Sequence, residues 1–495
     1  MTTDFVERAG MQTPARRAAS AQFKHVAEAN DIELVRLSWC DLHGTLRTKT
    51  LTVAAAIKAL DAGVSMVSTL MLKDTSDRTA FKVFEPGHSQ APHGFGYANN
   101  VILLPDPQSF KVLPWSPGIG WLRCEPFFED ATPIGLDTRR VLQQALSRLT
   151  ALGLSLTCGL EVEFHIYKID SSQPNPQLDP MQADWPGPAP MVKLIHPGYR
   201  LLSEQWADMS DEPLRIVQKT AQALGLPLTS LEIELGPSQV EAVFDATDAL
   251  TAADHMALFR SAATQALRRA GYHATFMCRP PFPNIMSSGW HLHQSLVRLA
   301  DGSNAFMRTE AATGYGPLDA RQTLSDLGCQ YLAGLLTHAR GMSVFCTPTT
   351  NGYGRFQPNA LAPQSAVWGR DNRGAMLRVI GAVGESASRI ENRIGEPAAN
   401  PYLYMAAQVH AGLHGIAQRL QAPAATEAPY APAQTLLPTS LPEALQALRD
   451  DAEMSAAFGA DFVQYLCQIK AMESTRLDQA PDSLEWHSRE YFSRI

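Results

Sequence analysis

Polar and apolar side chains alternate along one short segment of the chain, Gly159–Tyr167 (GLEVEFHIY). In a β-strand successive side chains point to opposite faces, so Glu161, Glu163, His165 and Tyr167 are predicted to share one face. The two carboxylates would lie about 7 Å apart. Buried together they would repel each other, and a positive group would have to compensate them. A solvated strand face is the simpler alternative, and this segment alone leaves both interpretations open.

Three further segments place polar residues on predicted strands, and two of them have this spacing of two between polar residues. The first contains Glu234 on a predicted strand and Glu241 after a Gly-Pro turn. The second contains His291, His293 and Ser295, and the third Arg389, Glu391 and Arg393. This spacing excludes a zinc site of the helical HExxH type. Mostly oxygen ligands favour Mg²⁺ or Mn²⁺, and two such ions can hold a phosphoryl group during transfer. With no Walker loop and no GxGxxG motif, the pattern indicates a metal-dependent phosphoryl-transfer enzyme of another type.

The elements that must position these residues divide into two regions. Residues 1–30 are predicted to form a leader that becomes helical near Ala15, and two strands joined by a tight turn follow, Glu33–Ser38 and Thr45–Leu51. A helix over Val53–Ala62 should end at Gly63. After the first region, helical patterns over Arg139–Leu152, Ala252–Gly271 and Leu324–Met342 alternate with strands.

Composition excludes several functional classes. The 495 residues allow two or three domains, and a net charge of -8 offers no basic surface for nucleic acid or anionic lipid. There is no apolar run long enough to span a membrane and no secretory signal in the first residues. The seven cysteines are scattered without a CxxC pair, which is typical of free thiols in a reducing cytoplasm.

At these residues the chain resembles the glutamine synthetase superfamily over nearly its whole length. The motifs, in the order of that family, are VRLSWCDLHGTLRTKT, GLEVEF, ELGPSQVE, SGWHLHQSL, PTTNGYGRF, WGRDNR, RIENR and ANPYLYMAA. The resemblance implies an α+β fold: a leader (1–30), a small β-grasp domain (31–117) and a large catalytic domain (118–495) with an antiparallel sheet and surrounding helices. It also implies a homo-oligomer of stacked rings, with each active site between neighbouring subunits.

The same resemblance implies roles for individual residues. One Mg²⁺ or Mn²⁺ ion would be held by Glu163, Glu234 and Glu241, and the second by Glu161, His291 and Glu391. Arg355 and Arg393 would bind the substrate carboxylates, and Arg373 and Arg378 would surround the transferring phosphate of ATP. Ser295 and His293 would lie on the nucleotide side, and Ser287 and Gly289 on the glutamate side. The implied reaction is ATP-dependent phosphorylation of the γ-carboxylate of glutamate, followed by displacement of phosphate by an amine.

Two departures from the family concern the amine. Where ammonia-using members carry a glutamate in an EAP motif, this chain has Leu361, and Val67 falls where the family has an aspartate that holds ammonium. A buried ammonium without a counter-charge is costly, so an amine that is neutral at pH 7 and apolar fits better. Aniline meets both conditions, and the sequence is similar to the γ-glutamylanilide synthetase branch. Alternatively, another acid such as Asp74 or Asp77 replaces the missing one.

A third departure concerns the acid substrate, because Met286 and Ser287 stand where the family's Asn and Gly contact the amino-acid end of glutamate. Glutamate remains favoured because Arg355 and Arg393 persist. The alternatives are a glutamine synthetase that uses ammonia, a synthetase for γ-glutamyl alkylamines or polyamines, and a non-catalytic amine sensor or structural ring protein. A silent relative would not need all six metal ligands.

Overall fold

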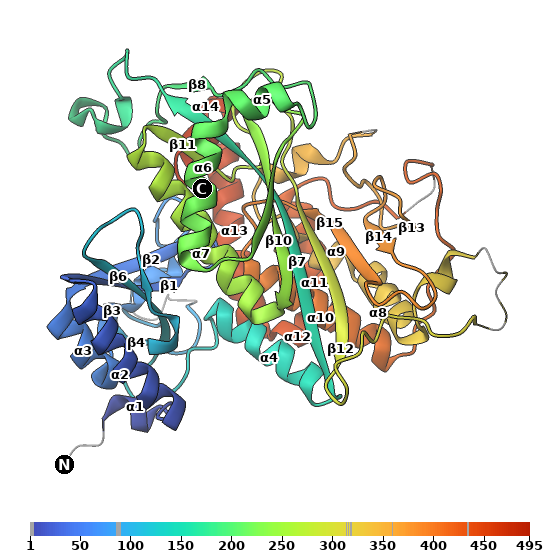
Figure 1. Cartoon of the computed structure of the whole chain (residues 1–495), viewed down its shortest axis with the longest axis horizontal. Helices are drawn as coiled ribbons and strands as arrows, with labels where there is room; N and C mark the ends of the chain where they lie inside the picture. The colour runs from blue at the N-terminus through green and yellow to red at the C-terminus, as the bar shows by residue number, and fades with distance from the viewer. Residues whose placement is uncertain are drawn as a thin grey trace.

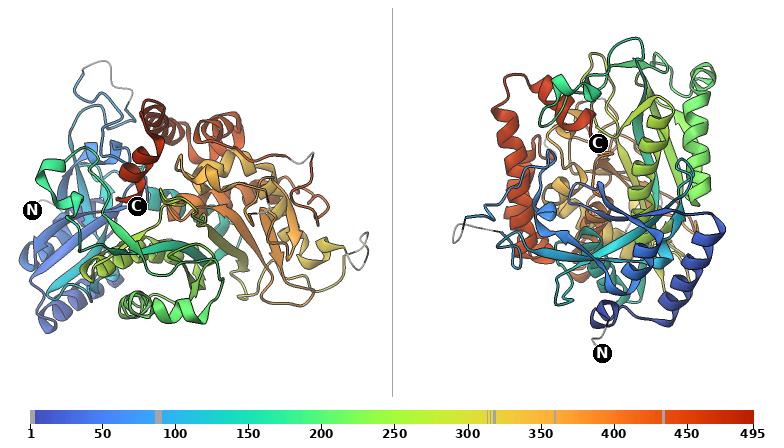
Figure 2. Two further views of the ribbon diagram at one scale, coloured as in Figure 1. Left: turned by 90° about the horizontal axis from the view of Figure 1, so that it is seen from above. Right: turned by 90° about the vertical axis from the view of Figure 1, so that its left-hand side faces the viewer.

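The computed structural model describes residues 4–85, 91–312, 314, 316, 319–358, 360–432 and 435–495. A small N-terminal sheet with three helices lies beside a larger sheet that runs through the middle of the molecule (Figure 1). Seen from above and from the side, the C-terminal helices cover the flank next to the N-terminal unit (Figure 2). The α+β fold expected from the sequence is confirmed.

Helices and strands are interspersed along the described chain as far as residue 395, and only helices follow. The helices are α1 (Phe5–Arg8), α2 (Pro14–Ala29), α3 (Val53–Ala62), α4 (Thr138–Thr150), α5 (Glu204–Met209), α6 (Asp211–Leu224), α7 (Ala249–Arg269), α8 (Asp326–Thr337), α9 (Ala339–Cys346), α10 (Pro401–Ala417), α11 (Leu441–Asp450), α12 (Ala452–Phe458), α13 (Ala460–Asp478) and α14 (Ser483–His487). The strands are β1 (Leu34–Cys40), β2 (Leu46–Thr52), β3 (Val64–Val67), β4 (Asn100–Pro105), β5 (Lys111–Val112), β6 (Ile119–Phe127), β7 (Leu154–Ile169), β8 (Val192–Leu194), β9 (Leu228–Ile233), β10 (Gln239–Asp248), β11 (Tyr272–Thr275), β12 (Trp290–Arg298), β13 (Trp368–Arg370), β14 (Leu377–Ile380) and β15 (Arg389–Gly395). None of the described helices is both long and apolar enough to cross a membrane.

The N-terminal sheet has the strand order β2-β1-β6-β4-β3, with β5 paired to β6. The predicted strand, turn, strand and helix are confirmed as β1, β2 and α3, and α3 ends at Gly63 with φ 67°, which glycine adopts without strain. β1 and β6 pair in parallel. Because β6 spans residues 119–127, this sheet continues past residue 117, where the sequence placed the end of the small domain.

The large sheet has nine strands, and β7 lies near its centre between β12 and β10. All its pairs are antiparallel except β13 with β14. The alternation predicted in β7 is confirmed, because Leu160, Val162 and Phe164 are buried in the hydrophobic core that includes α4, α7 and α10. Their neighbours Glu161 and Glu163 lie on the other face and are only partly covered.

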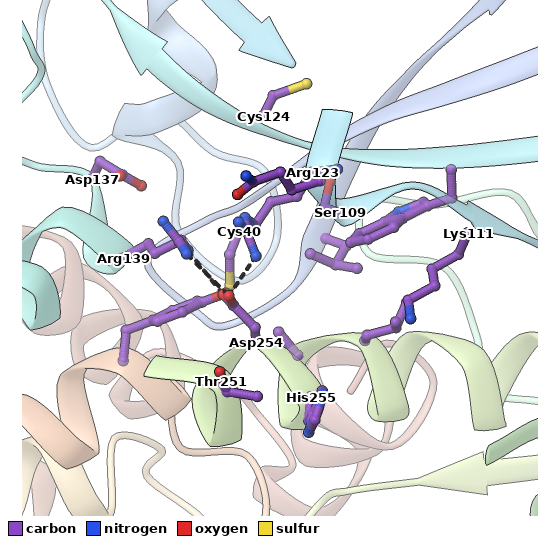
Figure 3. A pocket seen from close by; sticks show the side chains of 16 residues that line it. Cys40, Ser109, Lys111, Arg123, Cys124, Asp137, Arg139, Thr251, Asp254 and His255 are labelled. Carbon is purple, nitrogen blue, oxygen red and sulfur yellow. Dashed lines mark hydrogen bonds and ion pairs between the residues drawn. The ribbon is translucent and has the colours of Figure 1, made fainter. Parts of the chain in front are cut away.

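An ion-pair network joins the two sheets across α7. Asp254 of α7 accepts hydrogen bonds from Arg123 of β6, Arg139 of α4 (2.9 Å, Nε to Oδ1) and the Tyr402 hydroxyl (2.8 Å). Figure 3 shows these side chains around a cavity of about 180 Å³ between the sheets. The N-terminal unit therefore contacts the large one through the ion pair of Arg123 in β6 with Asp254 in α7.

One predicted helix is wrong in its extent. Leu324–Met342 was expected to be continuous, but α8 ends at Thr337 and α9 begins at Ala339. His338 between them leaves helical geometry, with φ -98° and ψ 12°. Its ring bridges Asp451 and His414, each at 2.7 Å, and these side-chain contacts hold the break.

Candidate active site

The register of the large sheet gathers the predicted site. Glu241 in β10 pairs with Glu163 in β7, and His291 in β12 pairs with Glu161. His293, also in β12, lies opposite Glu391 in β15, and Glu391 lies opposite Arg378 in β14. Residues directly opposite in antiparallel strands have Cβ atoms about 5 Å apart and share a face. Five neighbouring strands thus present acids, imidazoles and a guanidinium group to one surface.

The first acidic cluster consists of Glu163, Glu234 and Glu241, whose carboxylate oxygens lie within 4.8 Å of one another. Burial and the charge of Glu163 raise the pKa of Glu241 to about 10, and the same two causes raise that of Glu234 to about 7. No lysine or arginine forms an ion pair with these three among the described residues. Three close carboxylates without a cationic partner fit a hard divalent cation.

Glu234 was expected to stand on a strand, but β9 ends at Ile233 and Glu234 begins the turn to β10. Its Oε2 accepts a hydrogen bond from the backbone of Leu235 (3.1 Å). The turn GPS that follows brings the chain back so that Glu241 lies opposite Glu163. Glu234 therefore reaches the cluster from the end of the strand and not from its face.

The second cluster surrounds His291. Its Nδ1 lies 3.3 Å from Glu161 Oε2 and 3.8 Å from Glu391 Oε1. Burial and the charge of Arg393 lower the pKa of His291, so its ring is neutral and can act as a ligand. Although burial opposes ionisation, hydrogen bonds from His291 and His293 hold the pKa of Glu161 well below its usual value.

His293 lies in the same cluster, with Nε2 2.8 Å from Glu161 Oε1. The ligand atoms of Glu161, His293 and Glu391 also lie within 4.8 Å of one another, as do those of Glu161, Glu241 and His291. The two acidic clusters therefore meet at Glu161. Ser295, two residues further along β12, is partly exposed on the same face.

Two of the four predicted arginines contact the second cluster. Arg378 donates to Glu391 Oε2 (3.0 Å), and Arg393 donates to the other oxygen of the same carboxylate. Against the effect of burial, the nearby His291 ring and the charge of Arg393 lower the pKa of Glu391. Arg373 is exposed beside a cavity of about 660 Å³ that Arg370 and Asn372 also line.

Arg355 is buried and donates only to backbone carbonyls of β15, those of Arg393 (2.9 Å) and Gly395 (3.3 Å), with no carboxylate partner in the described part of the chain. Its guanidinium lies directly against Gly289, where any Cβ would overlap it. A buried guanidinium without an acid partner fits a substrate carboxylate. The backbone N–H of Gly289 donates to Glu163 (2.7 Å), and Ser287 accepts a hydrogen bond from Arg279.

The structure does not bring Val67 and Leu361 into one pocket of this chain. Val67 ends β3 at the edge of the N-terminal sheet, whereas Leu361 precedes β13, and these two strands lie on opposite sides of the molecule (Figure 1). Both side chains are exposed, Val67 by 41% and Leu361 by 59%. Leu361 has φ 54°, in the left-handed region that leucine rarely adopts.

Three polar residues of this site carry no role in the sequence analysis: Gln239, Arg279 and Arg389. Arg389 stands in the alternating segment RIENR, so its face was predictable although its partner was not. Arg389 donates from Nε to His293 Nδ1 (3.1 Å). Gln239 lies two residues before Glu241 and shares its alternation, but its partners in the turn and the loop were not predictable. Arg279 follows β11 and carries no periodic signal. His165 is fully buried and lies 3.3 Å from the Ser288 hydroxyl, outside the acidic clusters.

Comparison with known proteins agrees with this arrangement. Residues 135–489 match the family model of the glutamine synthetase catalytic domain, and the chain belongs to the glutamine synthetase family of ATP-dependent ligases. It is 37% identical to a γ-glutamylanilide synthase of Acinetobacter sp over 99% of both chains. It is 30% identical to a γ-glutamylethanolamide synthetase of Streptomyces coelicolor, covering 94% of each, and 30% identical to a glutamine synthetase of Clostridium saccharobutylicum, covering 82% and 81%.

Solved structures support the same fold. A ligand-free GmaS structure superposes with a TM-score of 0.74 at 26% identity, covering 93% of this chain and 97% of that one. The ADP complex of GmaS matches with a TM-score of 0.73 at 25% identity. Both likenesses extend over nearly the full length, so the N-terminal sheet and the catalytic sheet are part of the shared architecture.

Proposed function

We propose that this protein forms a γ-glutamyl amide from glutamate, ATP and an amine that is neutral and apolar at pH 7, with an arylamine such as aniline as the favoured substrate. The observation that carries the proposal is Leu361, an exposed apolar side chain where ammonia-using members of the family have a glutamate. The full-length similarity to a γ-glutamylanilide synthase supports it. The other two sequence relatives named above are a γ-glutamylethanolamide synthetase and a glutamine synthetase, so the choice of amine rests on the pocket and not on family membership.

The two acidic clusters would hold Mg²⁺ or Mn²⁺. Glu163, Glu234 and Glu241 would bind one ion, and Glu161, His291 and Glu391 the other. When bound, such ions neutralise the charge that develops on a transferring phosphoryl group. We assign His293, Ser295, Arg373 and Arg378 to the side of the second cluster that would bind ATP.

The chain's own residues account for both chemical steps. Arg355 and Arg393 would hold carboxylate groups of glutamate, so that one γ-carboxylate oxygen faces the γ-phosphorus of ATP. That oxygen forms the new P–O bond, ADP leaves, and γ-glutamyl phosphate results. The amine nitrogen then attacks the acyl carbon, inorganic phosphate leaves, and the nitrogen loses one proton as the amide forms. A neutral amine can start this second step without first giving up a proton.

The alternative acids, Asp74 and Asp77, are already paired within this chain. Asp74 is fully buried and lies 3.0 Å from the Arg476 guanidinium, while Asp77 pairs with Arg47 (2.7 Å) and Arg494 (3.3 Å). A carboxylate held between arginines does not serve as the counter-charge of an ammonium ion. This pairing supports an amine pocket without an acid.

We further propose that Val67 completes the pocket of a neighbouring subunit in a homo-oligomeric double ring. Val67 and Leu361 lie on distant units of one chain, so a shared apolar pocket requires two chains. Val67→Asp and Arg355→Ala subunits should each be inactive with aniline, and a mixture of the two, refolded together, should regain part of the wild-type activity with aniline. Arg355→Ala mixed with Arg393→Ala is the control and should stay inactive, because both changes affect the same half of the site.

The direct test is phosphate release from ATP with Mg²⁺ and glutamate across ammonium, ethylamine, ethanolamine, putrescine and aniline, with product mass measured in parallel. Selective turnover with aniline that yields a γ-glutamyl arylamide supports the proposal. Turnover with ammonium and with none of the other amines would support the ligase activity but overturn the role assigned to Leu361. Binding of amine without ATP turnover would favour the amine-sensing alternative.

A further inference from the structure

A single buried glutamine touches three parts of the candidate site. Gln239 begins β10 and is only 1% exposed. Its side-chain nitrogen lies 3.3 Å from Glu163 Oε2, 3.2 Å from the carbonyl of Ser287 and 2.9 Å from the Ser288 hydroxyl. Its side-chain oxygen accepts a hydrogen bond from the backbone N–H of Gly236 (2.8 Å).

The chemistry of these partners fixes the orientation of the amide. A carboxylate and a backbone carbonyl can only accept, so they require the NH₂ group of Gln239. The backbone N–H of Gly236 can only donate, so it requires the carbonyl oxygen. A flipped amide would face acceptors with an acceptor and a donor with a donor, leaving buried groups unsatisfied.

The Gly236 contact leaves no room for another arrangement. A Cβ at Gly236 would overlap the side-chain oxygen of Gln239 and the Cβ of Met286. The turn after Glu234, the Gln239 side chain and the loop that carries Ser287 are therefore packed against one another. A shift in any one of them would displace the others.

We infer that Gln239 is a positioning residue that couples the first acidic cluster to the glutamate-binding loop. The inference rests on the proposed metal site. Gln239 and the Gly289 N–H both donate to Oε2 of Glu163, which leaves Oε1 as the oxygen turned toward His291, 3.9 Å from its Nε2. Gln239 thus selects the Glu163 oxygen that faces the cation, and through Gly236 it holds the turn that presents Glu234.

The coupling runs in both directions. The same NH₂ group that orients Glu163 holds Ser287 and Ser288, which precede Gly289 against Arg355. A cation bound at the first cluster would favour the loop position that Gln239 holds. Glutamate bound at the loop would favour the orientation of Glu163 in which Oε1 faces the cation. Metal and glutamate should therefore bind cooperatively.

Gln239→Met tests the inference, because methionine keeps the length of the side chain and removes every hydrogen bond. We expect Mn²⁺ binding, measured by calorimetry on the whole protein, to weaken about tenfold or more, as for other groups that orient metal ligands. The KM for glutamate should rise, and the gain in Mn²⁺ affinity that glutamate produces in the wild type should disappear.

Gln408→Met is the matched control. Gln408 is also fully buried, and accepts from Gln294 (3.0 Å) and Asn392 (2.8 Å) on the opposite face of β12 and β15. This variant should lower the melting temperature while leaving Mn²⁺ affinity close to that of the wild type. Equal losses of metal affinity in both variants would reduce Gln239 to a purely structural role and overturn the inference.

Ser288→Ala separates the contact of Gln239 with the loop from its contact with Glu163, and it remains informative if Gln239→Met fails to fold. It removes one partner of Gln239 on the loop and leaves the contact with Glu163 in place. We expect a higher KM for glutamate with nearly unchanged Mn²⁺ affinity in the absence of glutamate, together with weaker cooperativity. Unchanged cooperativity would overturn the coupling, whereas absence of Mn²⁺ binding in the wild type would overturn the metal site itself.

Discussion

Arg389 donates a hydrogen bond from its Nε to Nδ1 of His293, across 3.1 Å. A nitrogen that accepts this bond carries no proton, so the neutral ring has its proton on Nε2, which faces Glu161. Nε2 is then a donor and has no lone pair to offer a metal. His291, in contrast, has no arginine donor among the described contacts. The two histidines of WHLH thus have different chemistry although they share one strand face.

The first prediction follows from this difference. His291→Asn should weaken Mn²⁺ binding by about 100-fold or more, because it removes a ligand and not merely a group that orients one. His293→Asn should change metal affinity much less and chiefly raise the KM for ATP. Calorimetry with Mn²⁺ and initial rates at varied ATP would measure both. Equal loss of metal affinity in the two variants would contradict the tautomer assignment.

The second prediction concerns the repulsion in the first cluster. Since burial raises the pKa of Glu241 to about 10, ionising it in the folded protein is unfavourable. Stability associated with this group is present at pH values below about 4.5 and is lost as the pH rises toward 10. Without divalent metal, Glu241→Gln should therefore raise the free energy of unfolding at pH 8 by about 1 kcal/mol or more.

With divalent metal bound, the wild type should become more stable than Glu241→Gln. Mg²⁺ or Mn²⁺ should raise the melting temperature of the wild type and have little effect on Glu241→Gln. Thermal unfolding with EDTA and with saturating Mn²⁺ gives the comparison. A variant that is less stable than the wild type in EDTA would show that the carboxylate repulsion is relieved by some other means.

The third prediction concerns the amine pocket. Leu361→Glu places a charge where we propose that an apolar amine binds, so kcat/KM for aniline should fall by about tenfold or more, equivalent to about 1.4 kcal/mol. Activity with ammonium should increase relative to aniline. Leu152→Glu is the control, because Leu152 has a similar exposure of 57% but follows α4 and not the segment before β13. An unaltered amine preference in Leu361→Glu would remove the role proposed for this residue.

The fourth prediction concerns acid stability at the C-terminus. Glu490 is fully buried and paired with Arg476; burial opposes its ionisation, but the hydrogen bonds from Arg476 prevail and lower its pKa. The pair therefore stabilises the protein above about pH 4.5, and this contribution is lost as the pH falls below that value. Glu490→Gln should cost about 3 kcal/mol at pH 7 and much less near pH 3.

Urea unfolding at both pH values would measure this difference. Glu485→Gln supplies the control, since Glu485 forms an exposed pair with Arg489 one helical turn away and should change stability by less than about 1 kcal/mol. A cost of Glu490→Gln that does not depend on pH would indicate packing, and not charge, as its source.

The fold was largely predictable where local chemistry determines it. Alternation identified the face of β7, and glycine at residue 63 identified the end of α3, because both signals lie within a few residues. The break at His338 was not predictable, since it depends on Asp451 and His414, which are distant in the sequence. For the same reason the sequence did not show that Ile119–Phe127 joins β1 in the first sheet.

The site was predictable as a set of residue types but not as a set of contacts. Periodicity placed Glu161 and Glu163 on one face, and the family resemblance supplied the other ligands. The pairing of His291 with Glu161 depends on strand register, which no single segment encodes. Gln239 was missed because its contacts come from a turn and a loop that are brought together only in three dimensions.

The strand pairing that assembles the clusters also affects how this protein must fold. The six proposed ligands lie between residues 161 and 391 and meet only when β7, β10, β12 and β15 are all in register. Because a slip of one residue turns every side chain of a strand to the other face, a partly paired sheet has no binding site. Such non-local contacts form late and slowly. Metal affinity should therefore appear only in the last stage of refolding, so a bound ion would report completion of the whole sheet.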